Sequence, residues 1–433
     1  MMDLVIRADR AVIDGGIRAA AIALADGRIR AIAPIDTDLP SADEIRLPVS
    51  AVLLPGFVDT HVHINEPGTD WEGFATATAA AAAGGITTLV DMPLDSDPVT
   101  TSVAALASKQ QSAQGNCRVD VRYWAGVVPA NIDDLAPLAE AGVAGFKCFL
   151  TDSGNRNFPR LGAGQFRRAA SRVAALDSVL LVHGESQHVI ADSPRAFGRR
   201  YASFLASRPD AAEQDAVALV LDTARDTGAR VHVVHVSSAQ VLPMLAEAKR
   251  SGVRVTAETC PHYLIFAAQS IPDGATEFAC CPPIRDDHNR DRLWGGLADG
   301  TLDMIVSDHS PCAPTVKADG DFGRVFGGIS SLEVAPRAVW THALQRGFGL
   351  PELCRWMAER PATLAGLADR GRIAVGYRAD LCAFEPDSEQ TVHAAALRHR
   401  HAATPYDGAV LRGSVAQTWL AGRSVYQRVA APA

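Results

Sequence analysis

The sequence has no cluster of basic residues and no excess of positive charge. Its 433 residues include 41 Lys and Arg, which are scattered along the chain, against 49 Asp and Glu, and the formal net charge is −8. Nucleic acids and anionic membrane surfaces attract clustered cations. We therefore expect neither of them as a partner of this protein.

Long apolar runs are also missing. No stretch is long enough to cross a bilayer, and the first residues lack the basic start and apolar core of a signal peptide. The 8 cysteines occur in a chain too large to need disulfides for its stability, and Cys148, Cys260 and Cys382 lie inside apolar segments. We therefore expect reduced thiols and a cytoplasmic protein.

The chain is rich in apolar residues, at 48%, which is enough to form a large core. From residue 52 onward, apolar runs typical of buried strands alternate with segments typical of helices, such as 72–83 and 211–227. The expected strands are 52–63, 86–93, 119–129, 143–150, 179–185, 229–238, 254–264 and 301–309. Eight strand–helix repeats over about 300 residues predict an α/β fold, the (β/α)₈ TIM barrel.

Short strands with tight turns occur near both ends of the chain. The Asp26-Gly27 pair between apolar runs is a hairpin signal, and short strands return after a helix expected at 351–367. Neither end has enough strands to be stable alone, so we expect both ends to pair into one small β-sandwich domain. The expected limits are 1–51 and 368–433 for this β domain and 52–367 for the barrel.

Two histidines, His61 and His63, end the first expected barrel strand. Residues two apart on a strand point to the same face. On a buried strand the imidazole nitrogens need partners, and a metal ion supplies one. Taken alone, an exposed strand end with two solvated histidines explains the pattern equally well.

Further candidate ligands follow the later strands, at the ends where barrels of this type place their chemistry. They are Lys147, His183, His235 and Asp308. Together with the first two histidines they form a set typical of a metal site. Each also has a structural alternative, because His183 fits a hydrogen-bonded core position and Asp308 fits a helix cap. His232 lies three residues before His235, so we expect it to face the helices in a structural role.

Lys147 is unusual because it lies in the strongly apolar segment 145–150. An unpaired ammonium group is costly there, and an ammonium group cannot ligate a cation. Two explanations remain open at this point. Lys147 forms an ion pair with Asp308, or its amine reacts with carbon dioxide to give a carbamate, whose two oxygens can bridge two metal ions.

Several segments resemble the cyclic amidohydrolases, a family that includes dihydroorotases, hydantoinases and allantoinases. The segments are Pro55-Gly56-Phe57-Val58-Asp59-Thr60-His61-Val62-His63, Gly145-Phe146-Lys147, Ser307-Asp308-His309-Ser310 and Gly376-Tyr377-Arg378-Ala379-Asp380-Leu381. The resemblance extends over nearly the whole chain. It implies two divalent metal ions, usually zinc, although such ligands also accept Co²⁺, Mn²⁺ or Fe²⁺. It also implies a homodimer or a homotetramer.

The resemblance assigns a role to each candidate ligand. His61, His63 and Asp308 are implied to bind one ion, His183 and His235 the other, and N6-carboxylated Lys147 to bridge them. In this family's chemistry, a hydroxide between the ions attacks the amide carbonyl of a ring. Asp308 then acts as general base and afterwards as general acid toward the departing ring nitrogen.

Two positions indicate which ring is the substrate. Dihydroorotases have Arg two residues after the His-x-His motif and Asn after Met-Pro, where this chain has Asn65 and Leu94. A ring substrate with a carboxylate would therefore lack the arginine that binds this group in dihydroorotases. Segments 65–68, 71–74 and 146–150 resemble allantoinases, so we expect allantoin, an uncharged cyclic ureide, to be converted to allantoate. Asn65, Cys281 and Ser310 are the expected substrate contacts, although Asn65 also suits a turn.

The chain departs from the allantoinase pattern in several rim loops, where specificity is set. The loop Gly68-Thr69-Asp70 is one residue short, Asp95 replaces the usual Asn, and Cys281 replaces Ser or Ala. A hydantoinase or dihydropyrimidinase therefore remains an alternative. A dihydroorotase, a mononuclear deaminase and a metal-free non-catalytic homologue fit less well, because no candidate ligand is missing and Lys147 is present.

Overall fold

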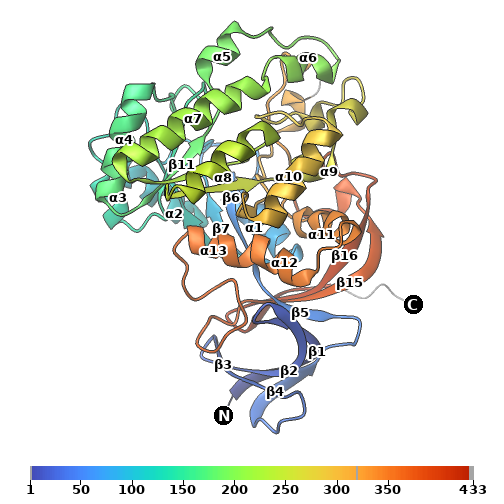
Figure 1. Ribbon diagram of the computed structural model, residues 1–433. Coiled ribbons are helices and arrows are strands. Elements are labelled where there is room, and N and C mark those ends of the chain that lie inside the picture. The colour runs from blue at the N-terminus through green and yellow to red at the C-terminus, as the bar shows by residue number, and fades with distance from the viewer. Residues whose placement is uncertain (1, 318–319, 429–433) are drawn as a thin grey trace.

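The chain forms a barrel of parallel strands with a smaller β domain at one end (Figure 1). The computed structural model describes residues 2–317 and 320–428. None of the helices within these ranges combines the length and the apolar character needed to span a membrane. The predicted (β/α)₈ barrel, with a β domain built from both chain ends, is confirmed.

Eight parallel strand positions form the barrel wall. They are β6 (Phe57–Val62), β7 (Ile86–Asp91), β8 (Asp120–Tyr123) continued by β9 (Ala125–Gly126), β10 (Phe146–Phe149), β11 (Val179–His183), β12 (Arg230–Val233), β13 (Val255–Thr259) and β14 (Met304–Ile305). The wall closes where Val62 and His309 form a parallel bridge and the His63 amide donates to the His309 carbonyl over 2.8 Å. Every residue of β7 and β11 is buried, as expected for parallel strands covered on both faces.

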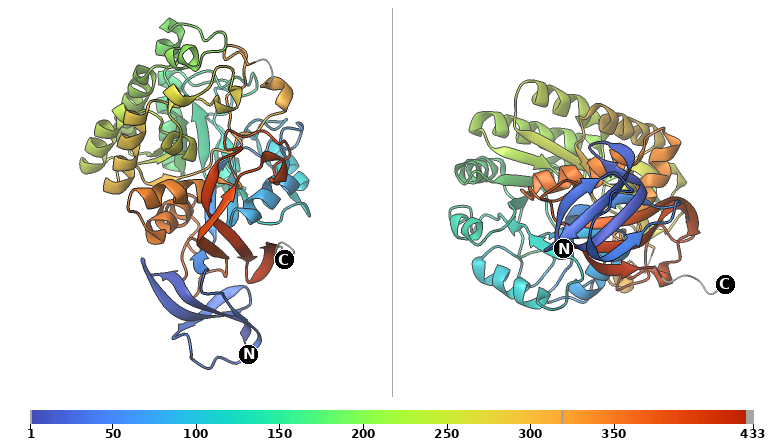
Figure 2. Two further views of the ribbon diagram at one scale, coloured as in Figure 1. Left: turned by 90° about the vertical axis from the view of Figure 1, so that its right-hand side faces the viewer. Right: turned by 90° about the horizontal axis from the view of Figure 1, so that it is seen from below.

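Helices surround the barrel wall (Figures 1 and 2). They are α1 (Phe74–Ala83), α2 (Val103–Ala113), α3 (Ala136–Glu140), α4 (Ala163–Ala175), α5 (Gln187–Asp192), α6 (Tyr201–Ala206), α7 (Asp210–Thr227), α8 (Leu242–Arg250), α9 (Pro261–Ile265), α10 (Asp287–Asp299), α11 (Ala335–Gln345), α12 (Leu350–Cys354), the π-helix η5 (Arg355–Glu359) and α13 (Arg360–Leu364). Helix α7 has acidic residues in its first turn and ends at Gly228, whose φ of 69° suits a left-handed cap.

The alanine-rich helix α1 packs where the barrel meets the β domain. Most of its alanines are fully buried, and small side chains allow neighbouring backbones to come close. The Thr418 hydroxyl donates to the Ala82 carbonyl over 2.7 Å, which links this helix to the C-terminal part of the chain. The alanine run therefore reflects close packing between the two parts of the molecule.

The β domain is one hydrogen-bonded sheet to which both chain ends contribute. Its strands are β1 (Met2–Ile13), β2 (Gly16–Ala25), β3 (Arg28–Ala33), β4 (Ser41–Arg46), β5 (Val52–Pro55), β15 (Leu381–Thr391), β16 (Val410–Leu420) and β17 (Arg423–Gln427). The order is β17-β16-β15-β5-β1-β2-β3, and β4 pairs with β1. Its core combines Ile6, Ile22 and Leu53 with Leu381 and Trp419, so neither end could form it alone.

The single strand predicted over 52–63 is in fact two strands that belong to different sheets. Strand β5 pairs with β1 and β15 in the β domain, whereas β6 pairs with β7 in the barrel. Gly56 lies between them, and a Cβ atom there would collide with Thr87. An unbroken apolar run carries no sign of this change of partner, which explains the error. Because β5 joins the amino end of β6, strands β1–β5 of the β domain lie at the end of the barrel opposite the carboxyl end of β6, whereas β15 and β16 continue along the side of the barrel beside α11 (Figures 1 and 2).

The later predicted strands are shorter than expected. The segment 254–264 becomes strand β13 followed by helix α9, which begins at Pro261, a residue well suited to a first helical turn. In the segment 301–309, only Met304–Ile305 is a strand. The residues that follow run along the barrel rim as irregular backbone and carry Asp308.

Candidate metal centre

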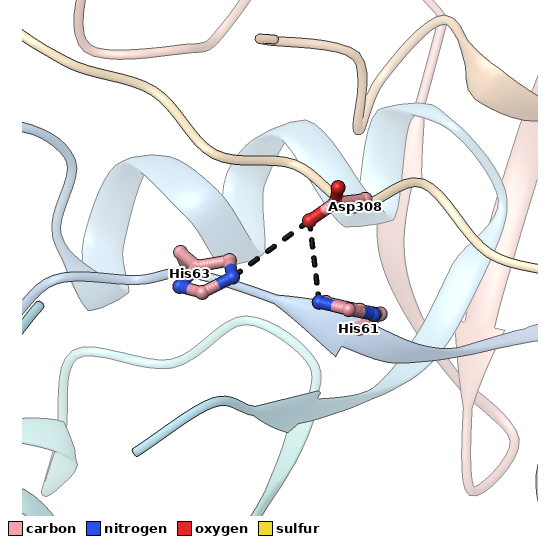
Figure 3. Close-up of side chains that lie close together, drawn as sticks. All are labelled: His61, His63 and Asp308. Atoms are coloured by element: carbon pink, nitrogen blue, oxygen red, sulfur yellow. Dashed lines mark ion pairs between the residues drawn. The ribbon is translucent and has the colours of Figure 1, made fainter. Parts of the chain in front are cut away.

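His61, His63 and Asp308 converge at the carboxyl end of β6 (Figure 3). The Oδ1 atom of Asp308 lies 3.2 Å from Nε2 of His61 and 3.7 Å from Nε2 of His63. One ligand atom from each residue lies within 4.8 Å of the other two, and all three residues are buried. The spacing and the chemistry of these atoms suit a divalent cation.

In His61 and His63, the ring nitrogen that does not face Asp308 contacts a neighbouring residue. Nδ1 of His61 lies 2.6 Å from Oε1 of Glu258, and Nδ1 of His63 lies 2.8 Å from the Leu94 carbonyl oxygen. Burial lowers the pKa of His63 well below its usual value, which favours the neutral ring. A carbonyl oxygen can only accept a hydrogen bond, so Nδ1 of His63 carries the proton and Nε2 carries a lone pair.

The lone pair of His63 therefore faces a carboxylate oxygen of Asp308, which is also an acceptor. Two acceptors turned toward each other in a buried site repel unless a cation lies between them. Burial also raises the pKa of Asp308 above its usual value. This arrangement fits the implied metal ion.

Lys147, His183 and His235 lie on the neighbouring strands of the same rim. Lys147 is in β10, His183 ends β11, and His235 follows β12. The rings of His183 and His235 meet edge to face with centroids 4.5 Å apart, and the His235 ring lies 5.4 Å from that of His61. Nδ1 of His235 is buried without a hydrogen-bond partner among the described residues, as expected for an atom that ligates a cation.

Burial disfavours the charged form of these basic groups. It lowers the pKa of Lys147 to about 8, against the opposing pull of Glu258 and Asp308. It lowers the pKa of His183 to about 4, although Glu185 opposes the shift. A site that disfavours cationic side chains in this way offers neutral nitrogen donors to a metal ion.

All six candidate ligands line a single cavity of about 750 Å³. Cys281 and Ser310, two of the expected substrate contacts, also line this cavity, as do the charged residues Asp95, Arg156 and Arg208. The third expected contact, Asn65, is buried instead. Its amide accepts from the Asp95 backbone N–H over 3.0 Å and donates to the Pro311 carbonyl over 3.3 Å. These bonds hold two rim loops together, so a substrate contact by Asn65 remains a prediction.

Sequence reasoning missed the buried acids behind the histidines. Glu258 bridges His61 and His232, with 2.9 Å between its Oε2 and Nε2 of His232. Glu185 lies 2.7 Å from Nε2 of His183 and pairs with Arg208. Burial would raise the pKa of both acids, but their basic partners outweigh it and lower each to about 2. A glutamate inside the apolar strand 254–264 was the available signal for Glu258.

His232 has the expected structural role but not the expected direction. It was predicted to face the helices, whereas its ring bonds Glu258, the acid that holds His61, and so points into the barrel. The prediction assumed regular alternation from His235. The φ of His235 is +39°, and β12 ends at Val233, so the alternation is broken between the two histidines.

Three residues at or beside the candidate site have an unusual backbone conformation. His235, Asp308 and Asn65 have φ values of 39°, 44° and 61°, a region that residues other than glycine rarely occupy. Such conformations cost about 1–3 kcal/mol each and persist where the surrounding structure enforces them. Strain shared by two candidate ligands and a residue that joins the rim loops supports a functional site.

Comparisons with known proteins agree with this geometry. The amidohydrolase family profile matches residues 52–425. An allantoinase of Streptomyces avermitilis is 49% identical over 98% of this chain and 95% of its own length. An allantoinase of Saccharomyces cerevisiae is 43% identical over 86% of this chain and 82% of its own length.

Among solved structures, an L-hydantoinase (dihydropyrimidinase) from Arthrobacter aurescens superimposes with a TM-score of 0.92. It is 29% identical, and the match covers 99% of this chain and 96% of that one. A match of this extent includes both the barrel and the β domain. The profile and these relatives show that the chain belongs to the amidohydrolase family.

Proposed function

We propose that this protein hydrolyses the ring amide of allantoin and releases allantoate. Family membership makes the chain a hydrolase of cyclic amides. The printed functions of the relatives from Streptomyces avermitilis and Saccharomyces cerevisiae favour allantoin. The observation that carries the proposal is Nε2 of His63 facing the Asp308 carboxyl group inside a cavity that also holds the other four candidate ligands.

Two divalent ions, for which zinc is the first choice, would be held by these residues. His61, His63 and Asp308 suit one ion, and His183 and His235 suit the other. N6-carboxylated Lys147 would bridge them, formed when the neutral amine attacks carbon dioxide and loses a proton. When bound, the ions supply Lewis acidity toward the ring carbonyl and make water easier to deprotonate.

The chain's own residues supply the remaining steps. Asp308, which lines the cavity, would accept a proton from the attacking water and deliver it to the ring nitrogen as the amide bond breaks. Burial raises the pKa of Asp308, which makes its carboxylate a better acceptor for the proton of the attacking water. Ser310 and the backbone near Cys281 line the cavity, where they can hydrogen-bond the amide groups of an uncharged ureide.

A hydantoinase or dihydropyrimidinase activity is the second candidate, supported by the solved hydantoinase of the same fold. The two candidates are separated by initial rates on allantoin, hydantoin, dihydrouracil and dihydroorotate at equal enzyme concentration. We expect the highest kcat/KM with allantoin. A preference for dihydroorotate would contradict the inference drawn from Asn65 and Leu94, and a preference for hydantoin or dihydrouracil would favour the second candidate.

The remaining expectations complete the proposal. We propose a cytoplasmic homodimer or homotetramer, in which residues 52–367 form the catalytic barrel and residues 1–51 and 368–433 the β domain. Strand β5 pairs within the β domain sheet, so residues 52–55 mark the passage between the two parts. Light scattering of the purified protein measures the oligomeric state directly.

A further inference from the structure

A second group of possible metal ligands lies beside Asp308. One ligand atom each from Cys260, His262 and Asp308 lies within 4.8 Å of the other two, and all three residues are buried. Cys260 directly follows β13, His262 lies in α9, and Asp308 follows β14, which pairs with β13. The adjacent strand ends therefore bring a thiol, an imidazole and a carboxylate together.

His262 gives this group an independent sign of a missing partner. Its side chain is fully buried, and within the described residues neither Nδ1 nor Nε2 has a hydrogen-bond partner. A buried imidazole with both nitrogens unpaired is costly, because it loses its hydrogen bonds to water and gains none in return. The ring of Tyr263, 4.2 Å away between centroids, gives it an apolar contact only.

We propose that Cys260, His262 and Asp308 form a third cation site that takes thiophilic divalent ions such as Zn²⁺ or Cd²⁺. Sulfur and imidazole ligands select such ions over Mg²⁺ or Ca²⁺, which prefer oxygen. Ligand atoms in a tetrahedral zinc site are about 3.3–3.7 Å apart, so the three groups need to approach one another by at most about 1.5 Å. The thiol proton leaves to solvent when the ion binds.

Sharing Asp308 gives the third site a functional consequence, which rests on the proposed catalytic role of that residue. An ion held by Cys260 and His262 fixes the Asp308 carboxylate and occupies a lone pair that it needs to accept a proton. Excess zinc or cadmium therefore inhibits the enzyme. The rate of turnover therefore falls as the concentration of thiophilic metal ions rises.

The test uses the purified holoenzyme titrated with Cd²⁺. The proposed catalytic ligands include no cysteine, so the ultraviolet charge-transfer band of a cadmium–thiolate bond reports only on a cysteine site. We expect this band to saturate at one Cd²⁺ per chain in the wild type and to be absent in Cys260→Ser. His262→Gln should weaken Cd²⁺ binding at least about tenfold, because it removes a ligand. Mg²⁺ should not compete.

Cys281→Ser is the matched control, since Cys281 is the partly exposed cysteine of the nearby cavity. The band should persist in this variant. A band that survives Cys260→Ser, or its absence from the wild type, would overturn the proposal. The spectral readout does not depend on turnover, so it remains decisive even if allantoin is not the substrate. In an active preparation, Cys260→Ser should also raise the inhibition constant for excess zinc at least tenfold.

Discussion

At the scale of single residues, the site depends on which ring nitrogen of each histidine contacts a neighbouring residue and which one faces the cavity. Glu258 and the Leu94 carbonyl hold Nδ1 of His61 and of His63, which leaves Nε2 facing Asp308. Glu185 instead lies against Nε2 of His183, which leaves Nδ1 for the cavity. These outer contacts determine which ring nitrogen faces the cavity and orient the ring, so in the proposed centre they would control metal affinity without touching the metal.

Glu258→Gln tests the role of the outer contacts. The amide keeps the shape of the side chain but removes the negative charge beside His61 and His232. We expect metal affinity and kcat to fall about 10–100-fold. Metal analysis and initial rates on one preparation measure both. Glu247→Gln, at an exposed glutamate that pairs with Arg250, is the matched control. Unchanged metal content and rate in Glu258→Gln would contradict the assignment.

Lys147 provides a prediction about pH. Only the neutral amine reacts with carbon dioxide, and burial lowers the pKa of Lys147 to about 8. The neutral fraction therefore rises as pH increases through about 8. Reactivation of the chelated protein by zinc and bicarbonate should become faster over this interval and level off above it. Zinc without bicarbonate is the control. A rate independent of both bicarbonate and pH would argue that Lys147 is not carboxylated.

The sequence predicted the residues that line the cavity better than the residues that support them. His61, Lys147 and Asp308 could be found because barrel chemistry gathers at strand ends, a rule that depends on position along the chain alone. Glu258 and Glu185 could not be assigned partners, because their partners come from other strands or helices. The direction of His232 was wrong because a positive φ at His235 breaks the alternation that the prediction assumed.

At the scale of elements, the passage from β5 to β6 joins the two parts of the molecule. Apolar runs and helix-ending glycines were enough to predict the strand–helix alternation and the barrel. They could not show that the run 52–63 divides at Gly56, because both halves are equally apolar and only tertiary pairing separates them. The Gly56 amide donates to the Asp380 carbonyl over 2.8 Å, which fixes the backbone at the passage.

Gly56→Ala tests how tightly this passage is packed. The new methyl group would collide with the buried side chain of Thr87, so we expect a loss of about 1–3 kcal/mol in stability and a lower Tm. Gly295→Ala is the matched control, because Gly295 lies in α10 with open space around it. The control should keep or raise the Tm, since alanine favours helix over glycine by about 1 kcal/mol. Equal Tm values in both variants would contradict the close packing at Gly56.

At the scale of the whole molecule, the N-terminal strands of the β domain and the side chains that line the cavity lie at different ends of the barrel. Strands β1–β5 lie at one end of the barrel, while strands far apart in sequence bring their candidate ligands to the other end (Figure 1). The cavity is therefore assembled only when the barrel is closed, as it is through Val62, His63 and His309. Ions bound to the folded protein alone would stabilise the whole barrel by mass action.

The central claim is that these six side chains hold two divalent ions on which hydrolysis of allantoin depends. The most direct measurement combines metal analysis with the rate of allantoin hydrolysis on one preparation, before chelation, after chelation and after zinc is restored with bicarbonate. The account predicts close to two divalent ions per chain, loss of turnover on chelation and recovery with zinc. Undiminished turnover by metal-free protein would contradict it.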